Sequence, residues 1–281
     1  MKHIPVLLDS VVSAIGDMRG LAIADCTFGA GGYSRAFLDA GARVVAFDRD
    51  PNVIPDAKEF QKKYGNMFRF IPETFSHLNE IDELFDVIVF DLGISSMQID
   101  NAERGFSFRM DAPLDMRMSE SGLSATDLIS AKSEQELAQI LREYGDVKKA
   151  TMLARAIKES RPKTTFALRD LIFNPNDIAP VFQALRIAVN DEFGELEKAL
   201  SAVPEKLKVG GKCICVTFHS IEDRIVKEKF RKWTTPLGDP RLPVMHPAPF
   251  TLIKAVTPDD NELKNNPRAR SAHMRGVVKS C

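Results

Sequence analysis

The sequence predicts an α/β fold: a doubly wound, Rossmann-like, mostly parallel sheet that carries a small inserted helical domain. Short apolar runs typical of buried strands alternate with helical patterns in the first third of the chain. A glycine-rich turn follows the first of these runs. The alternation stops between about residues 100 and 182, where no buried strand is evident, and then resumes. The interruption predicts an insertion into the parent sheet.

The elements before the interruption follow in a regular order. We expect strands at residues 21–26, 43–47, 68–71 and 86–91, the last apolar enough to be buried on both faces. A helix is expected at 32–39, and Gly41 would end it. These elements form the first half of the parallel sheet.

The insertion contains helical patterns. Residues 133–144 combine a capping box, Ser133 with Glu136, and apolar residues at helical spacing, and Gly145 is expected to stop the helix. After the insertion, we expect a helix at 181–207, a strand at 212–218 and a helix at 222–233. Residues 252–256 and 272–278 are predicted to close the sheet as antiparallel edge strands.

Composition excludes several classes of protein. Of the 281 residues, 44% are hydrophobic and 27% are charged, as in a globular enzyme. No apolar run approaches the roughly 20 residues that span a bilayer, and the N-terminus lacks a signal-peptide pattern, so we expect a cytoplasmic protein without a membrane partner. The four cysteines form no C-x-x-C pair, and neither a metal site nor a disulfide is expected; Cys213 and Cys215 would share one face of a strand.

The net charge of −1 does not indicate a nucleic-acid partner by itself. Residues 264–279, however, hold five basic side chains and no acidic one, which fits either a solvated edge or a binding surface.

The turn Gly29-Ala30-Gly31-Gly32 lies between a strand and a helix, as in sites for nucleotide-like ligands. Ser34 replaces the third glycine of the dinucleotide pattern, which disfavours NAD or FAD. Asp25 precedes the turn, where it would suit a cationic or amine-bearing ligand, and Asp48 ends the second strand, where it could bind ribose hydroxyls. An ordinary tight turn is the alternative.

Asp91 ends the fourth predicted strand. The carboxyl ends of parallel strands share one edge, so we expect Asp91 to lie in the same crevice as Gly31 and Asp48. A helix N-cap is the alternative role for such an aspartate.

Several motifs together resemble the bacterial 16S rRNA (cytosine N4)-methyltransferase family, RsmH or MraW, over nearly the whole chain. They are the segments 3–8, 27–35, 48–51, 91–98, 104–118, 182–190, 218–224 and 266–271, of which 104–118 (RGFSFRMDAPLDMRM) is the most specific. One departure stands out, since Ala179-Pro180 replaces the usual Thr-Arg pair. This change bears on the affinity for RNA or on the identity of the substrate, and not on the class of reaction. Tyr33 in place of the usual histidine is a milder change.

The resemblance implies a class I methyltransferase sheet formed by residues 1–103 and 183–281, with an inserted helical substrate-recognition domain at 104–182. It implies S-adenosyl-L-methionine as cofactor, 16S rRNA within the small ribosomal subunit as partner, and methylation of a decoding-centre cytosine. The cofactor contacts that it implies are Gly31, Gly32, Tyr33, Asp48, Phe75, Asp91 and Gln98.

A cytosine amino group is a weak, neutral nucleophile, so its methylation depends on positioning and electrostatics. We take Asp91 as the first candidate catalytic acid and Asp115 as the second. The base must leave its stack, and Phe106 and Phe108 could then stack on it; their alternative role is packing. The candidate substrate-binding residues are Phe106, Phe108, Arg109, Arg117, His219, Arg268 and Arg270, and His219 has helix capping as its alternative.

Competing functions stay open at this point. The same fold could act on another RNA, a protein or a small molecule, or the protein could be a non-catalytic ribosome-assembly factor. A hydrolase is disfavoured because Ser220 directly follows His219 without a nucleophile elbow. The sequence leaves the oligomeric state open between a monomer and a homodimer.

Overall fold

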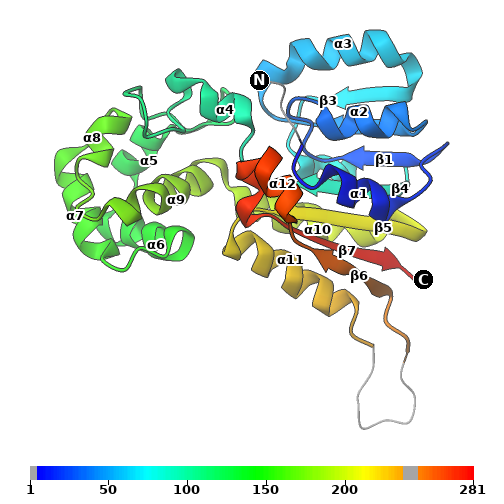
Figure 1. The fold of residues 1–281 in the computed structure, drawn as a ribbon. Helices are drawn as coiled ribbons and strands as arrows, with labels where there is room; N and C mark the ends of the chain where they lie inside the picture. The colour runs from blue at the N-terminus through cyan, green and yellow to red at the C-terminus, as the bar shows by residue number, and fades with distance from the viewer. Residues whose placement is uncertain (1–4, 237–245) are drawn as a thin grey trace. The chain divides into compact units, whose positions relative to one another are not determined.

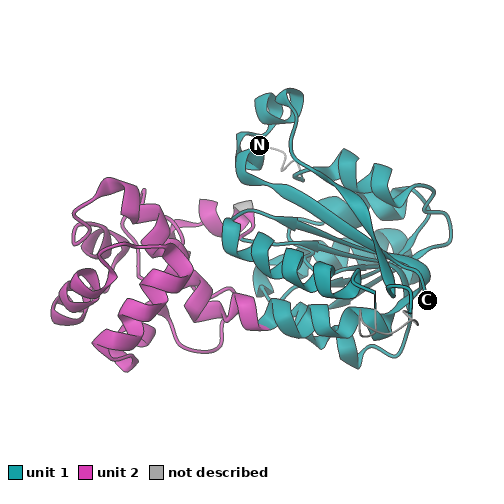
Figure 2. Ribbon diagram, turned by 90° about the horizontal axis from the view of Figure 1, so that it is seen from below, with its two compact units in different colours: residues 1–93, 195–281 teal, residues 94–194 magenta. Residues whose placement is uncertain are grey.

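The computed structural model describes residues 5–236 and 246–281 (Figure 1). The chain forms two compact units, residues 1–93 with 195–281 (unit 1) and residues 94–194 (unit 2), coloured separately in Figure 2. These boundaries differ from the predicted insertion at 104–182. Unit 2 begins earlier and ends later because Ile94, Leu185 and Val189 all pack in its own hydrophobic core.

Unit 1 is built on a seven-stranded sheet in the order β3-β2-β1-β4-β5-β7-β6. The first five strands pair in parallel, and β7 pairs antiparallel with both β5 and β6. The strands are β1 (Ala22–Asp25), β2 (Arg43–Phe47), β3 (Phe68–Ile71), β4 (Phe85–Asp91), β5 (Leu207–Thr217), β6 (Phe250–Val256) and β7 (His273–Lys279). The predicted α/β sheet is therefore confirmed, strand by strand, to within a few residues.

Helices cover both faces of the sheet. On one face, Leu196, Leu200, Val226 and Phe230 of α10 (Glu192–Lys206) and α11 (Ser220–Trp233) share a core with alternate strand residues. On the other face, the ring of Phe60 of α3 (Ile54–Tyr64) meets Phe28 edge-on and packs at a tilted angle against Phe68 of β3. Helices α1 (Leu8–Ile15) and α2 (Gly32–Asp39) precede and follow β1, and α12 (Asp260–Asn265) connects β6 to β7 (Figure 1).

Two predictions about the second half of the chain are wrong in detail. The helix expected at 181–207 is two helices, α9 (Ile178–Asn190) and α10, because Asp191 adopts a left-handed conformation with φ of 47°. The strand at 272–278 was expected at the sheet edge, but β7 lies between β5 and β6, so of these two strands β6 alone is at an edge. Nothing in the local pattern of β7 distinguishes these two positions.

Cys26, Cys213 and Cys215 are buried with free thiols in the core beneath α10 and α11, so the last two share a strand face as predicted. Within residues 5–236 and 246–281, no helix is long and apolar enough to cross a membrane.

Unit 2 is helical. Its helices are α4 (Ser96–Asp100), α5 (Ala125–Ala131), α6 (Glu134–Gly145), α7 (Ala150–Ser160), α8 (Thr165–Arg169) and α9. The predicted capping box of α6 is confirmed: Ser133 Oγ accepts from Glu136 N, and the Glu136 carboxylate accepts from Ser133 N.

Gly145 does not stop α6 as predicted, because it belongs to the helix and Asp146 is the left-handed cap. A Cβ at position 145 would lie 2.6 Å from the carbonyl oxygen of Pro180 and 3.2 Å from Cβ of Ala184, both in α9. The glycine is therefore required by the close approach of two helices and not by a turn.

Gly145→Ala should destabilise the protein by about 1–3 kcal/mol, because a methyl group in this contact forces α6 and α9 apart. Chemical denaturation measures the effect, with Gln135→Ala on the exposed face of the same helix as the control. Equal stability of the two variants would show that the helices tolerate a wider spacing.

Candidate active site at the carboxyl edge of the sheet

Parallel pairing brings three aspartates to one edge of unit 1. Asp25 ends β1, where it pairs in register with Ala46 of β2 and Val89 of β4. Asp48 directly follows β2, and Asp91 ends β4. The strand order reverses between β1 and β4, and ligands of open α/β sheets bind outside the carboxyl ends of the strands at such a point.

The glycine-rich turn approaches its neighbours too closely for a side chain. Gly31 has φ of 71°, and a Cβ there would lie 2.5 Å from the ring of Phe60. Gly32 begins α2, and a Cβ on it would collide with Pro5. Both predicted cofactor-binding glycines thus form a tight backbone turn beside Asp25 and Asp48.

Asp25 anchors this turn from inside. Its side chain is fully buried, Oδ2 accepts a hydrogen bond from Ser34 Oγ at 2.6 Å, and Oδ1 accepts one from Thr27 N at 3.2 Å. Burial raises the pKa of Asp25. The residue was expected to suit a ligand, but its carboxylate is occupied by the turn itself. In the sequence, Ser34 served only to disfavour a dinucleotide cofactor. In the structure, it is the side chain that donates a hydrogen bond to Asp25.

Asp48 is partly buried and is tied to the same turn. Its Oδ2 accepts from Gly29 N at 2.8 Å, and its Oδ1 accepts from Asp50 N at 2.9 Å. Burial raises the pKa of Asp48 to about 6. Each carboxylate oxygen has a second lone pair, so the group can still accept hydrogen bonds from two ligand hydroxyls.

Asp91 differs from the other two acids in having an unused oxygen. Its backbone N–H donates to Thr27 Oγ1 at 2.8 Å. Its Oδ1 is buried and makes no hydrogen bond to any residue that the structure describes. Burial, and then the charges of Asp25 and Glu222, raise the pKa of Asp91 well above its usual range. Such a group favours a cation or a hydrogen-bond donor as a ligand.

Two further predicted cofactor contacts, Phe75 and Tyr33, also belong to unit 1. Phe75 is half-buried at the start of the 3₁₀ helix Phe75–Glu80, which follows β3, and its ring meets Phe90 edge-on at 5.7 Å. Tyr33 is buried in α2, and its hydroxyl donates to the carbonyl of Val6. Burial, then Asp91 and Asp25, raise the pKa of Tyr33 well above its usual range. Their contact with a cofactor stays a prediction.

His219 caps α11, which is the alternative role considered above. Its Nδ1 accepts from Glu222 N at 3.4 Å, and its Nε2 lies 2.9 Å from Glu222 Oε1. Arg268 and Arg270 are exposed in the 3₁₀ helix Pro267–Ser271. Binding of substrate by these three residues stays a prediction.

The remaining predicted site residues belong to unit 2. Arg117 forms a two-bonded ion pair with Asp115, with distances of 2.8 and 2.7 Å. This pairing lowers the pKa of Asp115, so the second candidate acid is already held by a cation. Gln98 is buried and closes a capping box with Ser95 at the start of α4.

The two phenylalanines of the most specific motif pack in unit 2. Phe106 is 7% exposed in the hydrophobic core and lies beneath the guanidinium of Arg104. Phe108 is half-buried and meets Phe182 edge-on at 5.4 Å. The burial of Phe106 fits the packing role that was its alternative, and stacking of either ring on a base stays a prediction. Arg109 is exposed.

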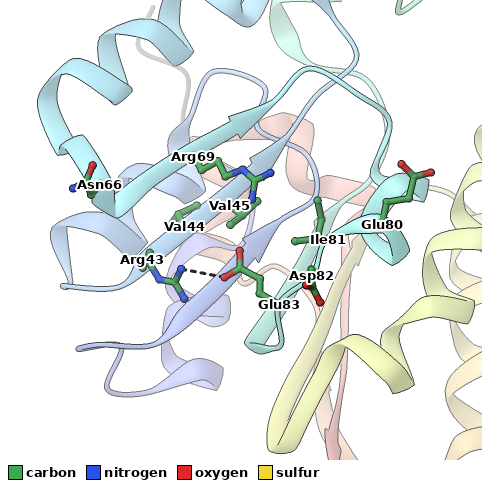
Figure 3. Close-up of a pocket in the computed structure, with 9 residues that line it drawn as sticks. All are labelled: Arg43, Val44, Val45, Asn66, Arg69, Glu80, Ile81, Asp82 and Glu83. Carbon is green, nitrogen blue, oxygen red and sulfur yellow. Dashed lines mark ion pairs between the residues drawn. The ribbon is translucent and has the colours of Figure 1, made fainter.

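A pocket of about 450 Å³ lies elsewhere in unit 1 (Figure 3). It is lined by residues at or near the amino ends of β2, β3 and β4, and the ion pair between Arg43 and Glu83 at 3.0 Å crosses it. The lining consists of Arg43, Val44, Val45, Asn66, Arg69, Glu80, Ile81, Asp82 and Glu83. None of the predicted site residues is among them. The carboxyl edge, where the three aspartates meet, therefore remains the candidate active site.

Similarity to known proteins identifies the family of this chain. A family model described as the MraW methylase family matches residues 1–280. The chain belongs to this family. Membership agrees with the Rossmann-like sheet and with the acidic carboxyl edge.

Relatives of the MraW methylase family align over the full chain. A protein named ribosomal RNA small subunit methyltransferase H from Mesorhizobium japonicum is 45% identical over 100% of this chain and 88% of its own length. One of the same name from Cereibacter sphaeroides (strain ATCC 17029 / ATH 2.4.9) is 46% identical over 99% of this chain and 90% of its own. A solved rRNA methylase from Streptococcus thermophilus is 13% identical, covers 99% of this chain and 98% of its own, and has a TM-score of 0.43.

The departure from the family pattern at Ala179-Pro180 falls in the first turn of α9. Proline is compatible with this position because the first turn of a helix needs no intrahelical N–H donors. Among the described residues, no group of three or more His, Cys, Asp or Glu side chains is arranged to hold a metal ion.

Sequence reasoning missed three residues of this edge: Thr27, Ser34 and Glu222. Glu222 is only 3% exposed, and its Oε2 accepts from Phe218 N at 3.0 Å. The signal was present in its position, since an acid three residues after a helix cap commonly bonds backwards to the chain before the helix.

The pKa of Asp48 is directly measurable. Carbon-13 NMR of the carboxyl carbons should show a signal with a midpoint of about 6, assigned by its loss in Asp48→Asn. Because the raised pKa means that the folded chain holds this proton more tightly than the unfolded chain, the associated stabilisation should fade as pH rises through about 6. A midpoint near the ordinary aspartate value of about 4 would contradict the desolvated environment.

Proposed function

We propose that this protein transfers a methyl group from S-adenosyl-L-methionine to the exocyclic N4 amino group of a decoding-centre cytosine in 16S rRNA. The observation that carries the proposal is Asp91, a partly buried acid at the switch point of the sheet whose Oδ1 is buried and has no hydrogen-bond partner among the described residues. The names of the full-length relatives support ribosomal RNA of the small subunit as the substrate. Such a substrate would place the protein in the cytoplasm.

The residues of the carboxyl edge fit the proposed cofactor. The glycine-rich turn lies against Asp48 through the hydrogen bond from Gly29 N, and Asp48 has acceptor capacity for both ribose hydroxyls. The acids around Asp91 provide a negative environment for a cation. When bound, the cofactor supplies an electrophilic methyl group on a positively charged sulfur.

The protein's own contribution to the reaction is positioning. The amino group of cytosine is neutral at pH 7 and needs no prior deprotonation, but its lone pair is delocalised into the ring. Asp91 Oδ1 can accept a hydrogen bond from one N–H of the cytosine amino group. This bond would favour a pyramidal nitrogen aimed at the methyl carbon. After transfer, the nitrogen carries a proton that must leave, and the same carboxylate is the acceptor in this proposal. Asp115 is the less suitable acid because Arg117 already neutralises it.

Substitution separates the two proposed roles. Asp48→Ala should weaken cofactor binding by about tenfold or more because two hydroxyl acceptors are lost, with little loss of fold. Asp91→Asn should lower turnover by about 100-fold, with a smaller change in cofactor affinity. Calorimetric binding and single-turnover methyl transfer measure these effects. Unchanged turnover in Asp91→Asn would remove this residue from the mechanism.

Methyl transfer itself is the test of the proposed function. Labelled S-adenosylmethionine and small ribosomal subunits from a strain without its own enzyme are incubated with the protein, and nucleosides are analysed by mass spectrometry. We expect N4-methylcytidine at one decoding-centre position. Cofactor binding without transfer would instead favour another RNA, protein or small molecule as substrate, or an assembly role, and would direct attention to Ala179-Pro180.

A further inference from the structure

Glu195 lies in the first turns of α10, at the same edge of unit 1 as the three aspartates. Helix α10 precedes the parallel strand β5, so its start lies at the carboxyl ends of the strands. The next residue, Leu196, packs in the core that also contains Phe90, and Phe75 packs against that core. Glu195 therefore lies near the start of α10, close to the segment that contains Phe75.

The two carboxylate oxygens of Glu195 differ in their hydrogen bonding. The side chain is 12% exposed, and Oε1 accepts a hydrogen bond from Lys198 Nζ at 3.0 Å. The second oxygen, Oε2, is buried and makes no hydrogen bond of acceptable geometry to the described residues. Each carboxylate oxygen has more than one lone pair, so this buried atom can accept a further hydrogen bond from a ligand even with hydroxyl groups nearby.

The surroundings keep this group ionised. Burial raises the pKa of Glu195, but the hydroxyls of Ser76 and Thr74 and the ammonium of Lys198 outweigh burial and lower it. Ser76 and Thr74 bond to each other at 2.7 Å and stand on either side of Phe75 in the chain. Oε2 is thus an acceptor, never a donor, beside the half-buried ring of Phe75.

A heterocycle lying beside Phe75 would meet this oxygen only if it carries a donor at its edge. Adenine carries one, its exocyclic 6-amino group, whereas hypoxanthine has an oxygen at the same position. We infer that Glu195 Oε2 accepts a hydrogen bond from the 6-amino group of the cofactor's adenine, which makes Glu195 a residue that selects the base. This inference rests on the proposed function, because it requires an adenosyl cofactor beside Phe75.

A purely structural role for Glu195 makes a different prediction. An acid near a helix N-terminus is stabilising through the helix dipole, whatever ligand is bound. In that case, removing its charge would lower stability and would change the affinity for adenine and hypoxanthine ligands equally. The distinction is therefore carried by a ratio of affinities and not by either affinity alone.

The experiment uses the full-length protein and two thioether ligands, S-adenosylhomocysteine and S-inosylhomocysteine, titrated by calorimetry. The wild type should bind the adenine ligand about tenfold or more tightly, because a hydrogen bond to a charged group is replaced by repulsion between two oxygens. Glu195→Gln should reduce or invert this preference. Lys198 keeps the amide oxygen on its side, and the amide N–H₂ then faces the base as a donor.

Glu197→Gln is the matched control, since Glu197 is exposed on the same helix, and it should keep the wild-type ratio. Equal binding of both ligands by the wild type would overturn the inference, even if Glu195→Gln failed to fold. So would a folded Glu195→Gln variant with an unchanged ratio. Failure of the wild type to bind either ligand would overturn the proposed function, and this inference with it.

Discussion

Parallel pairing of β1 with β2 on one side and β4 on the other is the constraint on which the active site depends. All four residues of β1 are buried, and the register places Asp25 opposite Ala46 and Val89. Three aspartates therefore end their strands at one edge, where the strand order reverses. Because alternate strand residues point to opposite faces, a slip of one residue in either pairing would exchange the faces of β1 or its neighbour and separate the acids.

The three acids are all desolvated, but they differ in how their carboxylate oxygens are hydrogen-bonded. The turn satisfies Asp25 through Ser34 and Thr27, and it satisfies one lone pair of each oxygen of Asp48 through backbone N–H groups. Only Asp91 keeps an oxygen without a partner among the described residues. Raised pKa values at all three positions mean that the edge is costly to ionise by itself and is stabilised by a cation. A positively charged cofactor is the complement of this arrangement.

Much of the sheet could be predicted because buried parallel strands leave continuous apolar runs, and strand ends are marked by aspartates. The failures have local physical causes. Gly145 resembled a helix stop, but it is required by the approach of α9, which no local pattern reveals. The break at Asp191 depends on one left-handed residue. For Phe106 the sequence left packing and stacking open, because a helical core and a base-binding surface use the same residue type, and the structure places it in the core of unit 2. Glu195 gains its environment from Thr74 and Ser76, which are distant in sequence, whereas the bond that Glu222 accepts from Phe218 N is local.

The central claim is that the cofactor binds at the carboxyl edge and not in the pocket at the amino ends of the strands. Calorimetric titration of S-adenosylmethionine into the wild type, Asp48→Ala and Arg43→Ala tests this claim most directly, since Arg43 lines that pocket and Asp48 does not. The account predicts tight binding to the wild type and to Arg43→Ala, with a clear loss in Asp48→Ala. Loss of binding in Arg43→Ala, with Asp48→Ala unaffected and both variants folded, would contradict it.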